Sequence, residues 1–536
     1  MTTKAQALTI IMLGATLAIA PAQTNQTTAA APATVAPALS STEQMIQDMK
    51  NPFPWLSWGA DMRIRNEYFN NAFSLTADQN FPPGGPGTSP FAAVHSQDYF
   101  RFRGRLWTSI TPVDGLSLNA RLAAEPRDFM EKAFSDTYFE QSGMQWRYGI
   151  IDNLNVQWKE PVDLPVTLTV GRQDIFLGDG WLVGDGTPED GSFTYFLDSA
   201  RATWELKDCH TTIDAIGIVQ YARPDAWLPT LGPSSTVADT QANPGPPYGH
   251  IEPFLLTDSN EKGAILWIAN KSLPAANVDA FFLYKHDSAI NDFPASLFTD
   301  NADIYTFGGR LSGALADHWK YSAEGAYQFG QKQDLELNSA LAVLRPNDPS
   351  VQTTGFRNLS AFGANSKLSY LFKDSWNDQL SLSFEFLSGD NPNTKTDEMF
   401  DSLWGRWPQW SEMNTYSDIQ ETRVGQTANL YRVGPTWSVT PVKDLDFSAS
   451  YYALFANQAV PTRDLDASYQ IPAGLQSQGP FSTTGTFRGH YLQSVLKYKF
   501  SRHLSGHLWG ELMFPGDFYV DRGMVTFLRA ELMFSL

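Results

Sequence analysis

Apolar and polar residues alternate with a period of two through most of the chain, in stretches of about ten residues. The stretch 318–330 shows the pattern clearly, because Trp319 and Tyr321 take one parity while Lys320 and Ser322 take the other. Successive side chains of a β-strand point to opposite faces of its sheet. Each such stretch therefore predicts a strand with one apolar face and one polar face.

Counting these stretches predicts about 18 strands. They lie at roughly 58–69, 97–110, 115–125, 146–158, 165–174, 196–207, 211–221, 262–270, 277–286, 303–315, 318–330, 358–372, 377–388, 425–439, 444–457, 488–501, 503–514 and 523–536. Short links such as 111–114 and 207–210 alternate with mostly long ones such as 222–261 and 388–424. Short turns at one rim and long loops at the other are typical of outer-membrane barrels. We therefore predict an all-β fold, a transmembrane antiparallel β-barrel with short periplasmic turns and long extracellular loops.

The apolar face is rich in aromatic residues, which separates the barrel from soluble alternatives. Aromatic residues make up 13% of the chain, with 35 Phe, 20 Tyr and 16 Trp. A soluble β-sandwich would bury an aliphatic face, and no fixed repeat of about 20 to 50 residues supports a propeller or a β-helix. The apolar face is thus expected to meet membrane lipid.

The N-terminus predicts export. Lys4 precedes an apolar run, 5–20, which is too short to span a membrane as a helix and ends at Pro21. Ala20-Pro21-Ala22 supplies a small-residue cleavage site. We expect a signal peptide at 1–22, a disordered Ala/Thr/Pro linker and lead-in at 23–50, and the barrel at 51–536, in the outer membrane of a Gram-negative-type bacterium.

Charge and cysteine content exclude several classes of function. A net charge of −19 argues against a nucleic-acid partner, because phosphate recognition needs clustered Lys and Arg. Cys209 is the single cysteine, so it forms no internal disulfide, and with only His210 beside it the pair lacks the ligands of a metal site. We predict neither a metal nor a cofactor.

Three consecutive predicted strands place arginines on their polar face. These are Arg63 and Arg65, then Arg101, Arg103 and Arg105, then Arg121. Paired strands lie about 4.8 Å apart, so the six side chains are expected to form one basic patch on the barrel's inner wall. That patch is dense for an acidic protein.

Further charges take the same parity on later strands. The basic ones are Arg147, Arg201, Arg310, Lys367, Arg432, Lys497, Lys499 and Arg529, and the interleaved acidic ones are Asp61, Glu67, Glu125, Glu205, Glu324, Glu385, Glu511 and Glu531. Either these charges pair across strands and stiffen the lumen, or some stay free to hold an anionic solute. We favour pairing for any single arginine and solute binding for the patch on the first three strands.

Arginine suits a carboxylate-bearing solute, because its planar fork makes two parallel hydrogen bonds and keeps its charge. Permeation requires weak, repeated binding, so a ladder of such sites serves better than one deep site. The expected solute is an anionic polymer or oligomer. Enzymatic alternatives have less support: a glycosidase carboxylate pair needs a known separation, and His503 or His507 with Ser505 lacks a nucleophile elbow. We predict that the chain is not an enzyme.

The stretch VGRQDIFLGDGWLVGDG, 170–186, does not fit a ligand loop. Its glycines lack nucleotide-binding spacing, and its aspartates lack the spacing of a calcium loop. As a strand entering an outer loop it has one conflict, because strict alternation would point Arg172 to lipid. We predict a bulge at Gly171 that turns Arg172 inward, with Asp174 near enough to orient it.

Three segments resemble the alginate export family of outer-membrane proteins. They are RFRGRLW (101–107), VGRQDIFLGDGWLVG (170–184) and GHLWGELMFPGDFY (506–519), with the ending LRAELMF. The resemblance covers about 58–536. It implies an 18-stranded passive pore with an arginine-rich constriction and no cofactor, and it allows partners in a periplasmic secretion apparatus. It implies wall roles for Arg101, Arg103, Arg105 and Arg172.

Two functions remain open. In the first, the pore passes an anionic polysaccharide or oligosaccharide resembling alginate. In the second, it is a general or small-solute uptake porin whose arginines only shape the electric field.

Overall fold

The computed structural model describes residues 40–71, 96–130, 143–145, 149–184, 196–221, 260–288, 301–333, 356–391, 394, 396–405, 409–413, 428–459, 482, 484–519 and 522–536. The predicted signal peptide, most of the predicted linker and Arg147 lie outside these residues.

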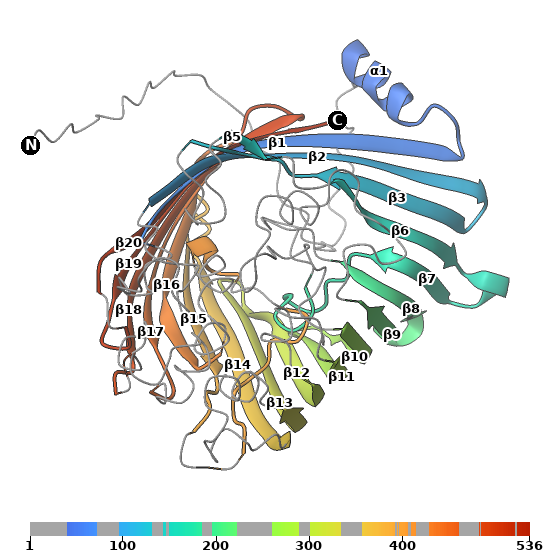
Figure 1. Ribbon diagram of the computed structural model, residues 1–536. Helices are drawn as coiled ribbons and strands as arrows, with labels where there is room; N and C mark the ends of the chain where they lie inside the picture. The colour runs from blue at the N-terminus through green and yellow to red at the C-terminus, as the bar shows by residue number, and fades with distance from the viewer. Residues whose placement is uncertain are drawn as a thin grey trace, which may run out of the picture.

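The strands close into a barrel, seen along its axis in Figure 1. The elements are α1 (Ser41–Lys50), β1 (Leu56–Asn70), β2 (Ser96–Val113), β3 (Leu116–Ala124), β4 (Arg127–Phe129), β5 (Gly143–Gln145), β6 (Gly149–Lys159), η1 (Pro161–Asp163), β7 (Val166–Gln173), β8 (Leu197–Leu206), η2 (Lys207–Cys209), β9 (Thr211–Gln220), β10 (Asn260–Leu273), β11 (Ala276–Ser288), β12 (Ala302–Ala316), β13 (Trp319–Gln333), β14 (Phe356–Leu371), β15 (Gln379–Leu387), β16 (Leu430–Val442), β17 (Leu445–Phe455), β18 (Phe487–Lys499), β19 (Leu504–Pro515) and β20 (Val525–Ser535).

All pairings between these strands are antiparallel, and β20 pairs with β1 to close the ring. β4 and β5 form a short hairpin that extends β2 beyond the end of β3, which leaves 18 strands in the barrel wall. The predicted antiparallel barrel of about 18 strands is confirmed.

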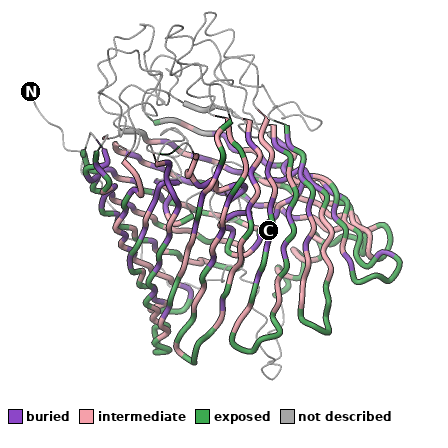
Figure 2. The backbone as a smooth tube through the Cα atoms, turned by 90° about the horizontal axis from the view of Figure 1, so that it is seen from below, coloured by how far each residue is buried: buried purple, intermediate pink, exposed green. Residues whose placement is uncertain are grey.

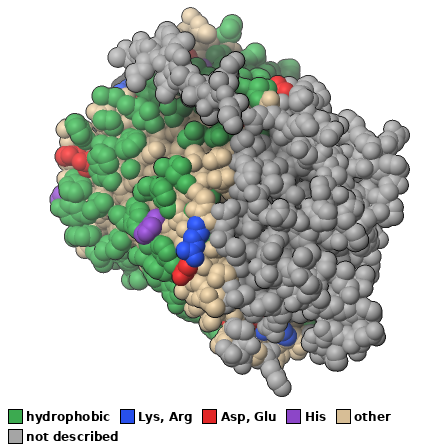
Figure 3. Space-filling view, turned by 60° about the vertical axis from the view of Figure 1, so that its left-hand side comes forward, with side chains coloured by type: hydrophobic (Ala, Val, Ile, Leu, Met, Phe, Trp, Pro, Cys, Tyr) green, Lys and Arg blue, Asp and Glu red, His purple; other side chains and the backbone are tan. Residues whose placement is uncertain are grey.

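Exposure alternates along the wall as the sequence pattern predicts. On β1, Arg63 is 1% exposed whereas its neighbour Met62 is 50% exposed. The barrel is thus apolar outside and polar inside, and apolar side chains cover much of the visible outer face (Figure 3). Because a charge facing lipid at mid-membrane costs about 2–4 kcal/mol, this sorting fixes which face of each strand turns inward.

The short turns gather at one end of the barrel (Figure 2). Both described chain ends lie there, since Lys50 Nζ of α1 donates to the carbonyl of Leu536 at 2.6 Å. The long links all join strands at the opposite end, which is the extracellular side of such a barrel.

α1 lies outside the barrel ring beside β1 (Figure 1). Ser40 caps the helix by accepting from the Glu43 N–H, and the Trp58 indole donates to the Met49 carbonyl. The lead-in predicted at 23–50 therefore ends in a helix. None of the helices in the described residues is long and apolar enough to cross a membrane.

The interior holds an apolar core of its own. Segments 174–184 and 396–405 turn into the ring and contribute Leu182 and Trp404 to a large buried cluster on the inner wall. A parallel bridge joins Val183 to Trp404, and Figure 1 shows coils from both regions, in teal and orange, inside the ring. Both segments follow predicted strands and were expected in outer loops, so their course into the ring corrects that expectation.

Candidate functional site

The register of β1 with its two neighbours sets the arginines against each other. Arg63 lies directly opposite Arg103, and Arg65 lies directly opposite Arg101 on β2. On the other side, Arg65 is opposite Glu531 of β20. Directly opposed side chains of an antiparallel pair lie about 4.5–5.5 Å apart at Cβ, so like charges here need carboxylates between them.

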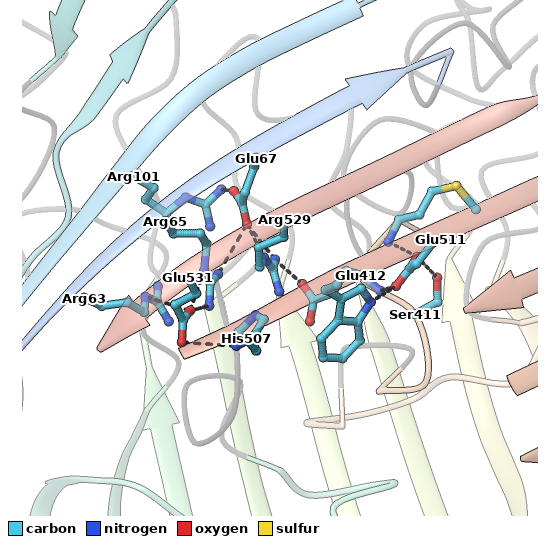
Figure 4. Close-up of polar contacts among 12 residues, drawn as sticks. Arg63, Arg65, Glu67, Arg101, Ser411, Glu412, His507, Glu511, Arg529 and Glu531 are labelled. Atoms are coloured by element: carbon cyan, nitrogen blue, oxygen red, sulfur yellow. Dashed lines mark hydrogen bonds and ion pairs between the residues drawn. The ribbon is translucent and has the colours of Figure 1, made fainter. Parts of the chain in front are cut away.

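Glu67 is the centre of this cluster (Figure 4). Its carboxylate pairs with Arg529 at 2.6 Å, Arg101 at 2.9 Å and Arg65 at 3.4 Å, and all four side chains are fully buried. A buried carboxylate is stable when guanidinium groups surround it, and removing such a partner leaves an uncompensated buried charge.

Two further glutamates complete the cluster. Glu531 pairs with Arg65 at 2.6 Å and approaches Arg63 at 3.8 Å, while Glu125 pairs with Arg63 at 3.1 Å and Arg101 at 3.4 Å. Arg529 also pairs with Glu412 at 2.7 Å. Four arginines of β1, β2 and β20 are thereby joined in one network: Arg63, Arg65, Arg101 and Arg529.

Arg103 differs from its neighbours. It is 4% exposed and faces inward, yet within the described part of the chain its guanidinium has no ion pair, and its buried Nε and Nη1 have no hydrogen-bond acceptor. The cluster then contains five guanidinium groups, of Arg63, Arg65, Arg101, Arg103 and Arg529, and four carboxylates, of Glu67, Glu125, Glu412 and Glu531. Arg103 is the guanidinium of this cluster that has no ion pair among the described residues.

The two remaining arginines of the patch are paired. Arg105 pairs with Asp61 at 2.6 Å, and Arg121 pairs with Asp152 at 2.7 Å and with Asp174 at 2.7 Å. Five of the six patch arginines therefore have carboxylate partners, which corrects the expectation that the patch as a whole is free to bind solute. Pairing dominates here because β1, β6 and β20, and the residues directly after β3 and β7, supply carboxylates beside these arginines.

Arg172 is fully buried, with Nε donating to Asp198 Oδ1 at 2.8 Å and the guanidinium 3.9 Å from the centre of the Phe196 ring. Phe196 packs with Ala123 and Ile150 in one buried cluster. Arg172 therefore does not lie in the outer, lipid-facing belt.

The predicted bulge at Gly171 is absent, because Gly171 pairs in regular register with both β6 and β8. Gly171 instead breaks the alternation with a φ of 125°, which side-chain-bearing residues rarely adopt. The register shift lies on β6, where Arg121 pairs with Asn153 and Leu122 with Ile151. The prediction that Asp174 orients Arg172 is also wrong. Asp198 pairs with Arg172, whereas Asp174 pairs with Arg121.

Arginines of the later strands have carboxylate partners, which is the arrangement expected for any single arginine. Arg201 pairs with Asp214 at 2.7 Å, Arg310 with Asp179 at 2.6 Å and Arg432 with Glu385 at 3.1 Å. Arg432 also lies over the rings of Trp410 and Tyr452. Glu205 is exposed and has no ion pair among the residues that the structure describes.

The inward segments are held to the far wall by indole hydrogen bonds. Trp404 Nε1 donates to Glu261 Oε2 at 3.3 Å, and its ring lies so close to Gly263 that a Cβ there would be 2.4 Å from it. Trp181 Nε1 donates to Glu385 Oε1 at 3.1 Å. Gly363 makes room for this part, since a Cβ there would be 2.6 Å from the Phe400 ring. The alternation of apolar and polar residues does not predict that these segments pack against the inner wall. The sequence feature that accompanies this packing is glycine at the wall positions that the large rings cover.

A third inward segment, 409–413, joins the cluster to β19. Ser411 Oγ, Glu412 N–H and Met413 N–H all donate to the Glu511 carboxylate, at 3.0, 2.9 and 2.8 Å. Glu412 then reaches Arg529 (Figure 4). The charged wall and this inward segment are thus connected through Glu511 and Glu412.

A polar hollow of about 530 Å³ opens on the inner wall of β3 and β6–β8, in the half of the barrel nearer the short turns. Its lining consists of the amides and hydroxyls of Asn119, Asn153, Asn155, Gln157, Thr167, Thr169, Gln173 and Thr203, with the charges of Lys159, Asp174, Arg201 and Glu205. Asn119 Nδ2 donates to Asn155 Oδ1 at 3.0 Å, so part of this lining is ordered. Such groups donate to and accept from hydroxylated solutes.

The residues weighed for catalysis on β19 have other partners. His503 Nε2 lies 3.2 Å from Glu43 of α1, and His507 Nδ1 lies 3.4 Å from Glu531. Among the described residues, no group of three or more His, Cys, Asp or Glu side chains could hold a metal ion.

A closed antiparallel barrel with an apolar outside and a polar inside is an outer-membrane pore. Residues 257–531, just over half of the chain, match the sequence model of the family described as alginate export. The chain belongs to the alginate export family, and it lies in the outer membrane of a Gram-negative-type bacterium. A barrel of this kind forms a pore whose polar lumen passes solutes across the outer membrane.

Among solved structures the chain is similar to Acinetobacter baumannii OccAB2 (TM-score 0.49, 9% identity), Pseudomonas aeruginosa OpdQ (0.48, 10%) and Pseudomonas aeruginosa OccK8, or OprE (0.47, 11%). Each comparison covers 89% of this chain and 98% of the other. Likeness this remote supports no statement about solutes. The search among curated proteins finds no relative.

Proposed function

We propose that this pore passes an anionic polysaccharide or oligosaccharide, of the polyuronate kind, and that Arg103 is the residue that selects for its charge. Three things support the proposal: membership of the alginate export family, the concentration of arginine on one wall, and the inward guanidinium of Arg103, which has no ion pair among the described residues. The family also suggests contact with a periplasmic secretion apparatus, which we include in the proposal.

The paired arginines position Arg103 rather than bind solute themselves. Arg101 and Arg105 flank it on β2 and Arg63 faces it across β1, and each of these is held by a carboxylate. Four guanidinium groups close together raise the local potential, while the carboxylates prevent the strands from repelling each other. A solute carboxylate that reaches Arg103 completes the missing charge pair.

Such a single site suits transport. A charge-assisted hydrogen bond contributes about 1.5–3 kcal/mol, which is enough to favour entry of an anion and weak enough to release it. The amide and hydroxyl lining of the polar hollow, toward the periplasmic rim, offers the remaining hydrogen bonds that a sugar unit needs. This arrangement replaces the expected ladder of free arginines by one charged site and one polar hollow.

One observation favours the second candidate, a general or small-solute uptake porin. Most inner-wall arginines already have carboxylate partners, so the wall's net charge is small and the ion pairs could serve only to hold the constriction. The two functions differ in whether Arg103 discriminates between solutes by charge.

The test is the reversal potential of the reconstituted pore across a planar bilayer under a potassium chloride gradient. Arg103→Gln is expected to lower chloride preference, and Arg103→Lys to keep it. The matched control is the neutral exchange Arg201→Gln with Asp214→Asn, which removes a wall arginine without changing net charge. Equal reversal potentials in the wild type and Arg103→Gln would favour the general porin.

A further inference from the structure

A second polar cluster lies on the outer face of the barrel, at the extracellular end of β11 and β12. His286 is opposite Asp303 in the register of these strands, and Ser288 follows His286 by two residues on the same face. These residues are near the ends of their strands, where the long link between β11 and β12 begins and finishes.

The three side chains form one hydrogen-bonded chain. His286 Nδ1 lies 2.8 Å from Asp303 Oδ1, and Ser288 Oγ lies 3.0 Å from His286 Nε2. An ionised carboxylate only accepts hydrogen bonds, so Nδ1 carries the proton and the Nε2 lone pair accepts from the serine hydroxyl. A serine on Nε2 and a carboxylate on Nδ1 is the order of a nucleophile, base and acid triad, which is recognised by geometry rather than by sequence position.

A fourth residue fixes the carboxylate. Tyr284 OH donates to the same oxygen, Asp303 Oδ1, at 2.7 Å. Asp303 Oδ1 therefore accepts hydrogen bonds from two side chains, Tyr284 and His286. The histidine and aspartate side chains are 33% and 43% exposed, so a substrate can reach the array.

The cluster faces outward at the level where lipid head groups lie. The intervening residues Leu283 and Lys285 are buried on the inner face, whereas Phe282 on the outer face is exposed. Tyr284, Tyr305 and Phe329 form a stack of rings with centroids 4.9 and 5.3 Å apart, as in the aromatic girdle at a membrane interface. His286 lies two residues beyond this stack, which is about 6.6 Å along a strand.

The strand on the other side of β11, β10, also places a residue suited to a lipid substrate beside His286. Lys262 of β10 is the register partner of His286 and is exposed on the outer face. It places a positive charge at the height of the cluster, where the head groups of anionic lipids lie.

An ordinary girdle histidine on the same barrel looks different. His490 of β18 is also on the outer face, and its Nδ1 is 2.8 Å from the hydroxyl of Tyr451. That pair has the aromatic partner expected of a girdle residue, without the serine and carboxylate that flank His286. The comparison provides a control within the same molecule.

We propose that Ser288, His286 and Asp303 form a serine esterase site that hydrolyses acyl esters of amphiphiles in the outer leaflet. Ser288 Oγ attacks the ester carbonyl carbon as its proton passes to His286 Nε2, and Asp303 stabilises the imidazolium. The bond from the carbonyl carbon to the alcohol oxygen breaks, and that oxygen takes the proton from Nε2. Water then attacks the acyl-serine by the same route and releases the fatty acid, which restores Ser288.

This activity is independent of the pore, and it departs from the expectation that the chain is not an enzyme. We assign only the nucleophile, the base and the carboxylate. Their position on the lipid-facing side means that loss of the site leaves the constriction untouched, because the arginine cluster lies on the inner face of β1, β2 and β20.

The test uses the purified full chain in detergent micelles with two probes, a fluorophosphonate that labels activated serines and p-nitrophenyl octanoate. We expect the fluorophosphonate on Ser288 by peptide mapping, and ester hydrolysis that falls at least about a hundredfold in Ser288→Ala and in His286→Gln. Asp303→Asn is expected to reduce both readouts as well, since it leaves the imidazole without its carboxylate. Labelling of wild type separates an activated serine from a merely buried one.

Matched controls are Ser360→Ala and His490→Ala, which remove an outer-face serine bonded to Tyr327 and the girdle histidine. Both are expected to keep the wild-type rate. Retention of the heat-modifiable electrophoretic form checks that each variant is folded. The proposal is overturned if folded wild-type protein carries no adduct at Ser288, or if Ser288→Ala hydrolyses the ester as fast as wild type.

Discussion

Arg103 lies directly opposite Arg63 across β1 and β2, and only one of the two is paired: Arg63 meets Glu125 at 3.1 Å, whereas Arg103 has no ion pair within the described residues. The register of β1 with β2 sets these two arginines opposite each other, and Glu125 reduces their repulsion by pairing with Arg63. Arg103 is therefore the arginine of this wall that we propose to contact an anionic solute.

Glu67→Gln is expected to destabilise the barrel by about 3–5 kcal/mol, since it leaves three buried guanidinium groups around a neutral amide. Urea unfolding in lipid vesicles measures the change. Glu205→Gln is the control, because Glu205 is exposed and has no ion pair among the described residues. Equal midpoints for Glu67→Gln and wild type would contradict the assigned role of Glu67.

The barrel and its inward-facing charges could be predicted from alternation, because one parity of each strand must avoid lipid. The partners of those charges could not, since alternation gives a residue's face but not the register between strands. Asp174 illustrates this: it follows Arg172 closely in sequence, yet it pairs with Arg121 across two strands. The triad is a similar case, because the register of β11 with β12 brings Asp303 to His286 across a long link.

Gly171→Ala is expected to lower stability by about 1–3 kcal/mol. A Cβ at this φ of 125° would also lie 2.3 Å from the Leu154 carbonyl oxygen. Thermal unfolding of the reconstituted protein reports the loss. Gly217→Ala, at a strand position with open space around the added Cβ, should be neutral, and an equal loss in both variants would show that the conformation of Gly171 is not the cause.

Trp404→Ala is expected to release segment 396–405 from the inner wall and to raise single-channel conductance. The side chain is 2% exposed and fills the space over Gly263, so its removal costs about 3–5 kcal/mol of packing. Trp376→Ala, at an exposed tryptophan in a short turn, is the control for loss of an indole. Unchanged conductance in Trp404→Ala would mean that the segment does not narrow the pore.

Segments 174–184 and 396–405 could not be placed from the sequence for a physical reason. Their apolar residues have no period of two, and their burial depends on small residues of distant strands, such as Gly263 and Gly363. A loop that packs inside a barrel therefore has the same local composition as one that lies outside it.

The most direct test of the central claim is block of single-channel current by a short oligouronate, compared with a neutral oligosaccharide of equal length. If Arg103 selects for anions, the oligouronate blocks wild type at lower concentration than the neutral sugar does, and Arg103→Gln weakens the oligouronate block by about tenfold to a hundredfold without changing block by the neutral sugar. The same blocking concentration of oligouronate for wild type and Arg103→Gln would contradict it.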